Sequence, residues 1–427
     1  MERRSSGTGS PGAGRGEGAS RGGGFVGRAE EARRLREALR AGPGLTVVRG
    51  EAGAGTSRLV DEVLGRAEFA EWTQLRGTCP DAADPVPLGP VADALAGLPY
   101  RPALADRPLP AVTGAVGLLV PELADRLPRP PASAADPEVR RGLLPRAVGA
   151  LLAAVGDAVL VVEDVHHADP ATLALLQHLT GAVPAGLRLV VTEDAAAGLP
   201  LLGVRAPAGV RVEEIAVLPW TPGETGEFVR HWLDAHRPDR TDEREDLTAL
   251  VHDLTGGLPS AAVELLRDSG ELLRGHDWED GLHRRGGEAG PWTGGAGGAA
   301  GGAGRGASHR DGGDTAAELR VGRGERVAGG VFGAVCEVGV PVRVGRELAR
   351  RCGPLDGDAR RIVEAAAVLG LPVSVGVLAE VADLAPERAE AAVDACVRRS
   401  VLRADGPCPG FRHPLDRRAA LARLSGP

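Results

Sequence analysis

Three short apolar runs in the first half of the chain have the pattern of buried strands. Leu45–Val48 ends in glycines, Ala158–Val162 ends in two carboxylates, and Leu187–Thr192 repeats the apolar signal. Continuous runs of this kind are typical of parallel strands that are covered on both faces. Helical patterns over Phe25–Leu39 and Asp169–Leu179 accompany them. Because parallel neighbours need crossover connections, the alternation predicts an α/β fold: a parallel sheet with helices on both faces.

The rest of the chain is patterned mainly for helices. Pro222–Asp234, Glu243–Leu254 and a glycine turn that leads into a helix at Gly256–Leu266 predict a small helical lid. Within Gly345–Arg418, three more helical patterns surround RRIVEAAAVLG, PERAEAAVDACVRRS and HPLDRRAALARL, with a short extended piece near Val401–Arg403. This part of the sequence predicts a mostly helical, winged-helix-like domain.

Glycine dominates two segments, residues 1–24 and about 285–330, in a chain that holds 63 glycines and 33 prolines. Such stretches cannot bury enough apolar surface to offset the entropy of ordering. We therefore expect five parts along the chain. They are a disordered tail (1–24), an α/β domain (25–219), a helical lid (220–284), a Gly-rich flexible linker (285–340) and a winged-helix-like domain (341–427).

Charge, cysteines and hydropathy exclude several classes of protein. The formal net charge of -8 provides no overall basic field for a phosphate backbone. Five scattered cysteines without a CxxC pair argue against a disulfide framework and a zinc site, and favour reduced thiols. No run approaches the roughly 20 apolar residues of a membrane span, and residues 1–24 lack the apolar region of a signal peptide. We expect a cytoplasmic protein with no membrane association.

The segment GEAGAGTS follows a predicted strand and opens a predicted helix, which is the context of a GxxxxGK[ST] phosphate loop (P-loop). Its glycines let the backbone curl so that successive N–H groups point at phosphate oxygens, and the helix dipole adds positive potential. The serine hydroxyl would contact Mg²⁺. A glycine-rich turn without a ligand is the alternative. The expected contacts of ATP or ADP are Gly50, Ala52, Gly53, Ala54, Gly55, Thr56, Ser57 and Arg58.

Thr56 occupies the position of the P-loop lysine and carries no charge. A charge-assisted hydrogen bond is worth about 1.5–3 kcal/mol, so nucleotide affinity is expected to be about 10- to 100-fold weaker than with lysine. Hydrolysis is expected to suffer more, because the charge on the transferring phosphoryl group must be stabilised. The chain contains no lysine at all, and Arg49 and Arg58 beside the loop are not placed like the missing side chain.

The apolar run Val159–Val162 ends in Glu163 and Asp164, which is the form of a Walker B element. We interpret Glu163 as the acid that holds Mg²⁺ through water and Asp164 as the acid that polarises the attacking water. These two residues are the candidate catalytic pair, and with Ser57 they form the candidate Mg²⁺ site. An acidic loop after a buried strand is the alternative.

Four signatures together resemble the ATPase module of the large LuxR-type ATP-binding transcriptional regulators. This group lies within the wider STAND and AAA ATPases and is similar to origin-recognition ATPases. The resemblance implies that Val26, Gly27 and Arg28 lie on the base side of the nucleotide; an ordinary helix entry is the alternative. The signatures are FVGRAEE (Phe25–Glu31), GEAGAGTSRL (Gly50–Leu59), VVEDVHHADPATLALLQHL (Val161–Leu179) and FRHPLDRRA (Phe411–Ala419).

The chain departs from this family at the γ-phosphate. Thr56 replaces the lysine, and Glu193-Asp194 stand where the family often has Tyr-Arg, which removes a phosphate-sensing arginine. We therefore hypothesise a regulatory ATP/ADP-binding module with weak or no hydrolysis, whose state a protein partner or a second copy senses.

Two alternatives stay open: an active Mg²⁺-dependent ATPase, and a nucleotide-independent scaffold or truncated regulator. Members of the family usually end in a LuxR helix-turn-helix that reads the major groove. The sequence contains no such segment, so we do not expect DNA binding from this chain alone.

Overall fold

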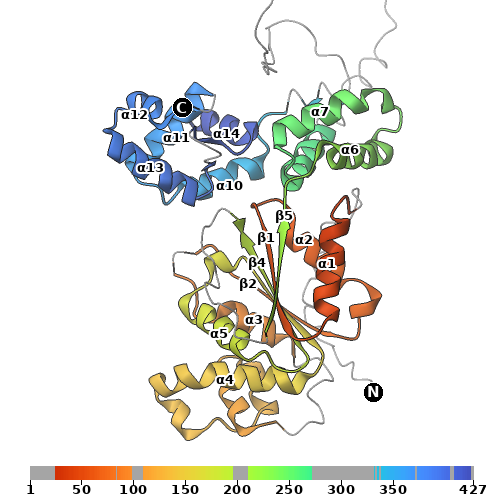
Figure 1. The fold of residues 1–427 in the computed structure, drawn as a ribbon, viewed down its shortest axis with the longest axis vertical. Coiled ribbons are helices and arrows are strands. Elements are labelled where there is room, and N and C mark those ends of the chain that lie inside the picture. Colours follow the sequence, from red (N-terminus) through yellow and green to blue (C-terminus); the bar gives the residue numbers. More distant parts are fainter. Residues whose placement is uncertain are drawn as a thin grey trace, which may run out of the picture.

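A parallel sheet of five strands lies at the centre of the N-terminal half of the chain (Figure 1). The computed structural model describes residues 25–82, 84–98, 109–195, 210–271, 331, 334–335, 338–370, 373–403 and 408–424. The strand order is β2-β3-β4-β1-β5, and all neighbours are parallel. The strands are β1 (Gly44–Gly50), β2 (Thr73–Thr78), β3 (Ala158–Glu163), β4 (Leu187–Asp194) and β5 (Arg211–Val217). The predicted parallel α/β fold is confirmed.

Alternate residues of the central strands pack into two separate cores, one on each face of the sheet. In β1, Val48 belongs to the first core, whereas Leu45 and Val47 belong to the second. The first core is covered by α1 (Ala29–Arg40) and α2 (Thr56–Leu64). The second core is covered by α3 (Gly89–Ala96), α4 (Pro137–Val155) and α5 (Pro170–Gly181). Burial on both faces explains why β1, β3 and β4 are mainly apolar.

The sequence pattern missed the two outer strands. β2 reads TQLRGT and β5 reads RVEEIAV, and their polar residues interrupt the apolar signal because each strand has only one neighbour. Helix α1 begins at Ala29 and not at Phe25, because Gly27 and Arg28 adopt φ values of +65° and +64°. Short 3₁₀ helices cover Ala67–Phe69, Ala111–Leu118, Pro121–Arg126, Ala132–Ala135, Val165–His167 and Thr241–Glu243.

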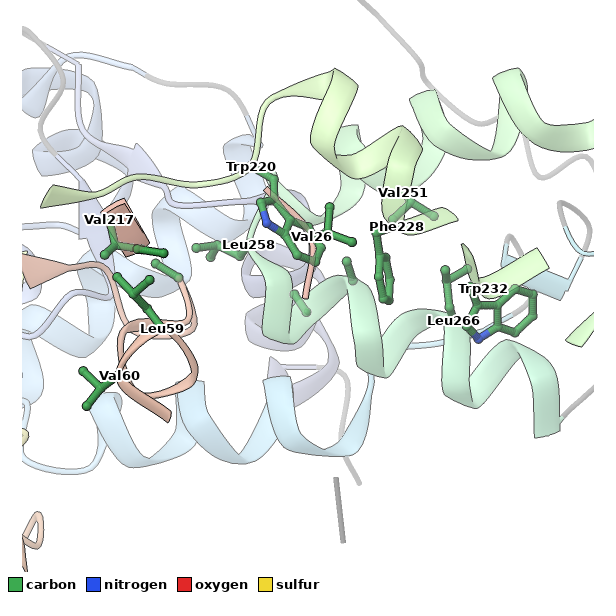
Figure 2. Packing of buried hydrophobic residues seen from close by; sticks show 14 of the residues in the cluster. Val26, Leu59, Val60, Val217, Trp220, Phe228, Trp232, Val251, Leu258 and Leu266 are labelled. Carbon is green, nitrogen blue, oxygen red and sulfur yellow. The ribbon is translucent and has the colours of Figure 1, made fainter. Parts of the chain in front are cut away.

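The region predicted to be a lid is helical and directly follows the sheet. It comprises α6 (Pro222–His236), α7 (Arg244–Thr255) and a helix over residues 259–271. Thr221 and Glu224 form a capping box that starts α6. Figure 2 shows Trp220 and Phe228 of this region beside Val26 and Leu258, in a core that continues to Leu59 of α2. The lid and the α2 face of the sheet thus share one hydrophobic core.

The C-terminal part is mostly helical and has a third core of its own. Its elements are α10 (Val342–Cys352), α11 (Gly357–Leu369), α12 (Val375–Val381), α13 (Pro386–Arg398), the antiparallel strands β6 (Leu402–Arg403) and β7 (Gly410–Phe411), and α14 (Pro414–Leu424). Val344 and Leu415 join the first core, so this part packs against the lid (Figure 1). The description of this part as winged-helix-like stays a prediction.

Part of the predicted flexible linker is packed against the lid. Val331, Val335 and Val338 are buried in the first core, and their spacing places them on one helical face. The predicted domain boundaries, including the end of the linker at position 340, stay predictions. The predicted tail and most of the linker lie outside the described residues. Within the described residues, none of the helices has both the length and the apolar character required of a membrane span.

Candidate functional site

The loop between β1 and α2 has the backbone geometry of a phosphate-binding loop. Gly53 and Gly55 have φ values of +90° and +94°, in the left-handed region where a side chain costs about 1–2 kcal/mol. Gly55 directly precedes α2, whose first turn holds no acidic residue. The N–H groups at a helix start have no acceptor within the helix, and the helix dipole makes this end positive. The start of α2 is therefore suited to an anion.

This loop opens onto a cleft of about 2340 Å³. Residues 50–58 of the loop line one side, including every position predicted there to contact nucleotide. Leu258, Pro259 and Ser260 of the lid line another side, and residues of α10 and α14 line a third. Small-ligand sites commonly measure about 300–1000 Å³, so the cleft has room for a nucleotide.

Gly53 is also the place where the lid meets the loop. The backbone N–H of Ser260 donates a hydrogen bond to the Gly53 carbonyl at 3.2 Å. A Cβ added to Gly53 would lie 2.3 Å from the Ser260 hydroxyl oxygen. Glycine is thus required here by its φ value and by the approach of the lid.

Gly53→Ala should weaken nucleotide binding about tenfold, because it strains the loop by roughly 1–2 kcal/mol and pushes the lid away. Gly42→Ala is the matched control, since Gly42 has φ +107° with open space around its Cβ position. Gly42 lies in the turn before β1, so an alanine there causes the same kind of backbone strain as at Gly53 without contacting the cleft. Titration of a fluorescent ATP analogue checks both variants. Equal affinities in the two variants would contradict the role given to Gly53.

Thr56 and Ser57 form the first turn of α2 and line the cleft. The Thr56 methyl group turns back toward the loop, where it would lie 2.9 Å from a Cβ at Gly50. Arg49 is paired with Glu193 and, at 3.3 Å, with Glu214. Its guanidinium therefore faces carboxylates on the neighbouring strands.

The acids at the end of β3 have different surroundings. Glu163 is 8% exposed, and its carboxylate accepts hydrogen bonds from Thr78 Oγ1 at 3.3 Å and Arg76 Nη1 at 3.4 Å. Asp164 lines the cleft, and its backbone N–H donates to Thr192 Oγ1 at 3.0 Å. Burial, together with the neighbouring Glu163 charge, raises the pKa of Asp164. Of the two predicted catalytic acids, Asp164 is the one that borders the space beside the P-loop.

The N-terminal segment supports the loop and the lid. Val26 is 3% exposed and packs in the first core, while Val26 and Arg28 line the cleft. The Arg28 guanidinium donates to the backbone carbonyls of Ala54, at 3.3 Å, and Leu218. A Cβ at Gly27 would lie 2.1 Å from a carboxylate oxygen of Glu224 in α6. The three residues that the resemblance places on the base side thus also join the P-loop to the lid.

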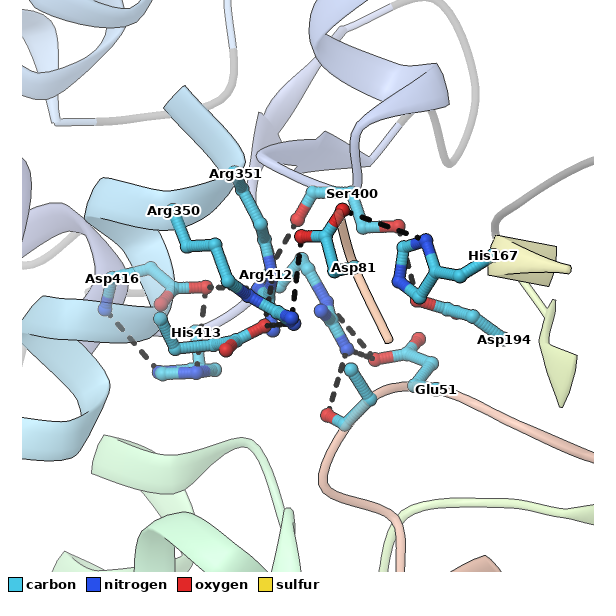
Figure 3. A network of polar contacts seen from close by, with 12 residues as sticks. Glu51, Asp81, His167, Asp194, Arg350, Arg351, Ser400, Arg412, His413 and Asp416 are labelled. Carbon is cyan, nitrogen blue, oxygen red and sulfur yellow. Dashed lines mark hydrogen bonds and ion pairs between the residues drawn. The ribbon is translucent and has the colours of Figure 1, made fainter. Parts of the chain in front are cut away.

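The sequence interpretation missed the contribution of the C-terminal part to this site. Arg412 is 6% exposed and contacts the P-loop, with its Nη2 at 2.8 Å from Glu51 Oε2 and 3.3 Å from the Ala52 carbonyl (Figure 3). Arg350 of α10 forms an ion pair with Asp81 at 3.2 Å, and Ser400 Oγ donates to Asp194 at 3.4 Å. Arg412 lies in the FRHPLDRRA signature. Its contacts could not be predicted from the sequence, because the residues that it contacts are far away along the chain.

Next to Arg412 lies a buried pair, His413 and Asp416, which also borders the cleft. The backbone N–H of Asp416 donates to His413 Nδ1 at 3.3 Å, and His413 Nε2 lies 3.4 Å from Asp416 Oδ2. Burial lowers the pKa of His413 to about 3 and raises the pKa of Asp416 to about 6. Near neutral pH the imidazole is uncharged and the carboxylate is charged, with Arg351 at 3.9 Å.

Comparisons with known proteins agree with this geometry. Residues 24–192 match the family model of the AAA ATPase domain. Among solved structures, the chain is similar to the Walker-type ATPase PABY2304 of Pyrococcus abyssi, with 14% identity and a TM-score of 0.55 over 93% of this chain and 96% of that one. At this identity the similarity shows the fold alone. Residues 24–192 therefore correspond to a P-loop AAA ATPase domain, which is a nucleotide-binding class of domain.

Two further solved structures are more distant. The ORC2 protein of Aeropyrum pernix has 13% identity and a TM-score of 0.46, over 93% of this chain and 95% of that one. A STAND protein with a tetratricopeptide repeat sensor from Pyrococcus horikoshii has 14% identity and a TM-score of 0.33, over 94% of this chain and 43% of that one. No curated protein matches the sequence.

Proposed function

We propose that this chain is a regulatory ATP/ADP-binding module with weak or no hydrolysis, of the type found in LuxR-type transcriptional regulators. The observation that carries this proposal is the position of the P-loop. It opens onto a cleft whose other walls are the lid and the C-terminal part. A nucleotide in this cleft would touch all three parts and bias how they pack against one another.

The residues present fit a Mg²⁺-nucleotide. Left-handed glycines 53 and 55 and the start of α2 offer backbone N–H groups to the phosphates. Ser57 would hold Mg²⁺, which neutralises phosphate charge when bound. We assign the acidic side of the metal site to Asp164 ahead of Glu163, because Asp164 borders the cleft whereas Glu163 accepts from Thr78 and Arg76.

Weak hydrolysis follows from the charges around the γ-phosphate position. Thr56 brings no cation, and its side chain turns toward Gly50. At the end of β4, Glu193 and Asp194 border the cleft; Glu193 is paired with Arg49, and Asp194 adds negative charge. Phosphoryl transfer depends on positive groups that stabilise developing charge, so this arrangement favours a binding switch over a fast enzyme.

Affinity for ATP and ADP, with and without Mg²⁺, tests the proposal. We expect binding of both nucleotides to the full chain, with ATP more dependent on Mg²⁺. Limited proteolysis of the C-terminal part in the same samples should differ between the free and nucleotide-bound chain. Absence of any binding at millimolar nucleotide would overturn the proposal and favour a nucleotide-independent scaffold.

An active Mg²⁺-dependent ATPase is the second candidate, because Asp164 and Ser57 both border the cleft. In that case phosphate release would be measurable, and Asp164→Asn would lower it to background while the fold is kept. Exposed Asp394→Asn on α13 is the matched control. Release that is unchanged by Asp164→Asn would exclude Asp164-dependent hydrolysis.

The regulatory output requires a partner. We propose that a protein partner or a second copy of the chain reads the packing of the C-terminal part against the lid. The predicted boundaries of the α/β domain, the lid and the winged-helix-like domain belong to this proposal. Sedimentation of the chain with ATP, with ADP and without nucleotide would detect self-association.

A further inference from the structure

A P-loop without lysine leaves a triphosphate without its usual cation. Of the arginines beside this loop, Arg49 is paired with Glu193 and Glu214. Arg28 donates to the carbonyls of Leu218 and Ala54. Arg58 is exposed on α2. Arg28 and Arg49 are thus committed to other partners, whereas Arg58 lines the cleft but is exposed and not buried against the P-loop.

Arg412 differs from these arginines in its surroundings. It is 6% exposed, and it enters the site from the segment between β7 and α14. Its Nε and Nη2 contact Glu51 Oε2 at 3.3 and 2.8 Å, and Nη2 also donates to the Ala52 carbonyl at 3.3 Å. Its Nη1 is buried and has no hydrogen-bond partner within the described residues. An unsatisfied buried donor costs about 1–3 kcal/mol, more for a charged group, and a polar atom of this kind needs an explanation.

We propose that Arg412 supplies the cation that Thr56 lacks, by binding the β- or γ-phosphate of a nucleotide held by the P-loop. This inference rests on the proposed function. The guanidinium already touches two residues of the loop, and its planar fork suits phosphate oxygens. A phosphate has more acceptor oxygens than Glu51 and Ala52 offer, and it satisfies Nη1 as well.

Glu51 is then an internal anion that holds Arg412 in the absence of nucleotide. The carboxylate and the phosphate compete for one guanidinium, so exchange between them needs only a change of side-chain torsions. Because Arg412 belongs to the C-terminal part, this exchange makes nucleotide affinity depend on the docking of that part onto the P-loop.

The test measures binding of a fluorescent N-methylanthraniloyl-ATP to the full-length chain. Arg412→Gln should weaken binding about 10- to 100-fold, as expected for loss of a charge-assisted contact. Glu51→Gln should strengthen it several-fold, because the competing anion is removed. If the pair were only a docking ion pair, both substitutions would weaken binding, and that result would overturn the proposal.

A double variant provides an independent check. Thr56→Lys in the Arg412→Gln background should restore affinity to the wild-type range, with a larger gain than in the wild-type background. Arg417→Gln is the matched control, since Arg417 lies on α14 but donates to the Ala367 carbonyl at 2.9 Å within the C-terminal part. Its binding should equal that of the wild type.

The outcomes separate the two proposals. A wild-type chain that binds no nucleotide overturns the proposed function and this inference with it. A wild-type chain that binds, with Arg412→Gln binding equally well, overturns the role of Arg412 alone.

Discussion

Thr56→Lys should raise the affinity of the chain for ATP about 10- to 100-fold, the value of a charge-assisted hydrogen bond of about 1.5–3 kcal/mol. Position 56 begins α2 and borders the cleft, so an ammonium group there can approach the phosphates. The chain has no lysine of its own, but the proposed Arg412 contact supplies part of the missing charge, so the gain in the wild-type background should lie toward the lower end of this range. The gain should be larger for ATP than for ADP, because a lysine at this place reaches the β- and γ-phosphates.

Thr56→Gln is the control for this prediction, because glutamine adds length without charge. Titration calorimetry with ATP and ADP should find little change in that variant. Phosphate release in Thr56→Lys should also rise above the wild-type level, since the added charge stabilises the transferring phosphoryl group. Equal affinity of wild type and Thr56→Lys would mean that the loop does not hold phosphates in this orientation.

Asp416→Asn should stabilise the folded chain by about 3 kcal/mol at pH 7, because burial raises the pKa of Asp416 to about 6 from an ordinary value of 3.8. When the pKa of a carboxyl is higher in the folded than in the unfolded state, its contribution to the free energy of unfolding is fully present below the unfolded-state pKa. That contribution is lost as pH rises through the folded pKa. Asp416 Oδ2 is buried without a hydrogen-bond partner within the described residues, which gives the shift its structural cause.

The difference between wild type and Asp416→Asn should therefore vanish near pH 4 and grow up to about pH 6. His413 has the opposite dependence, because burial lowers its pKa to about 3 and its contribution is lost as pH falls below about 6.5. Because His413 Nε2 lies 3.4 Å from Asp416 Oδ2, the two titrations are coupled, and the difference between the two proteins is read mainly above the pH at which His413 becomes neutral. Urea unfolding followed by tryptophan fluorescence at several pH values measures the difference in free energy of unfolding between wild type and Asp416→Asn. Asp394→Asn, at an exposed position, is the control for removing one carboxylate, and a pH-independent difference for Asp416→Asn would contradict this prediction.

Much of the fold was predictable because its signals are local. β1, β3 and β4 are buried on both faces, so their central residues are mainly apolar and the pattern identified them. The outer strands β2 and β5 were missed, since each carries polar residues that only a known neighbour explains. Helices α6 and α7 were predicted nearly to their ends, because Thr221, Glu224 and Gly256 mark helix starts and stops in the sequence itself.

The candidate site was predictable to a smaller extent. The P-loop positions follow from one contiguous segment, and the structure places all of them on the cleft. The roles of Glu163 and Asp164 stay predictions. Their order did not reveal that Asp164 borders the cleft, because this depends on contacts with Thr78, Arg76 and Thr192 of neighbouring strands. The hydrogen bonds by which Arg28 joins Ala54 to Leu218 could also not be predicted from the local sequence pattern.

The sequence alone therefore determined the parallel α/β architecture, the glycine loop before α2 and the absence of its lysine. These features depend on periodicity, on left-handed glycine conformations and on residue identity, all of which are local properties of a chain. Only the tertiary structure decided that Arg412 lies on Glu51, 361 positions away along the chain. Contacts of this kind arise from the docking of separately folded parts. No short stretch of sequence specifies which charged side chain of one part will contact which side chain of another.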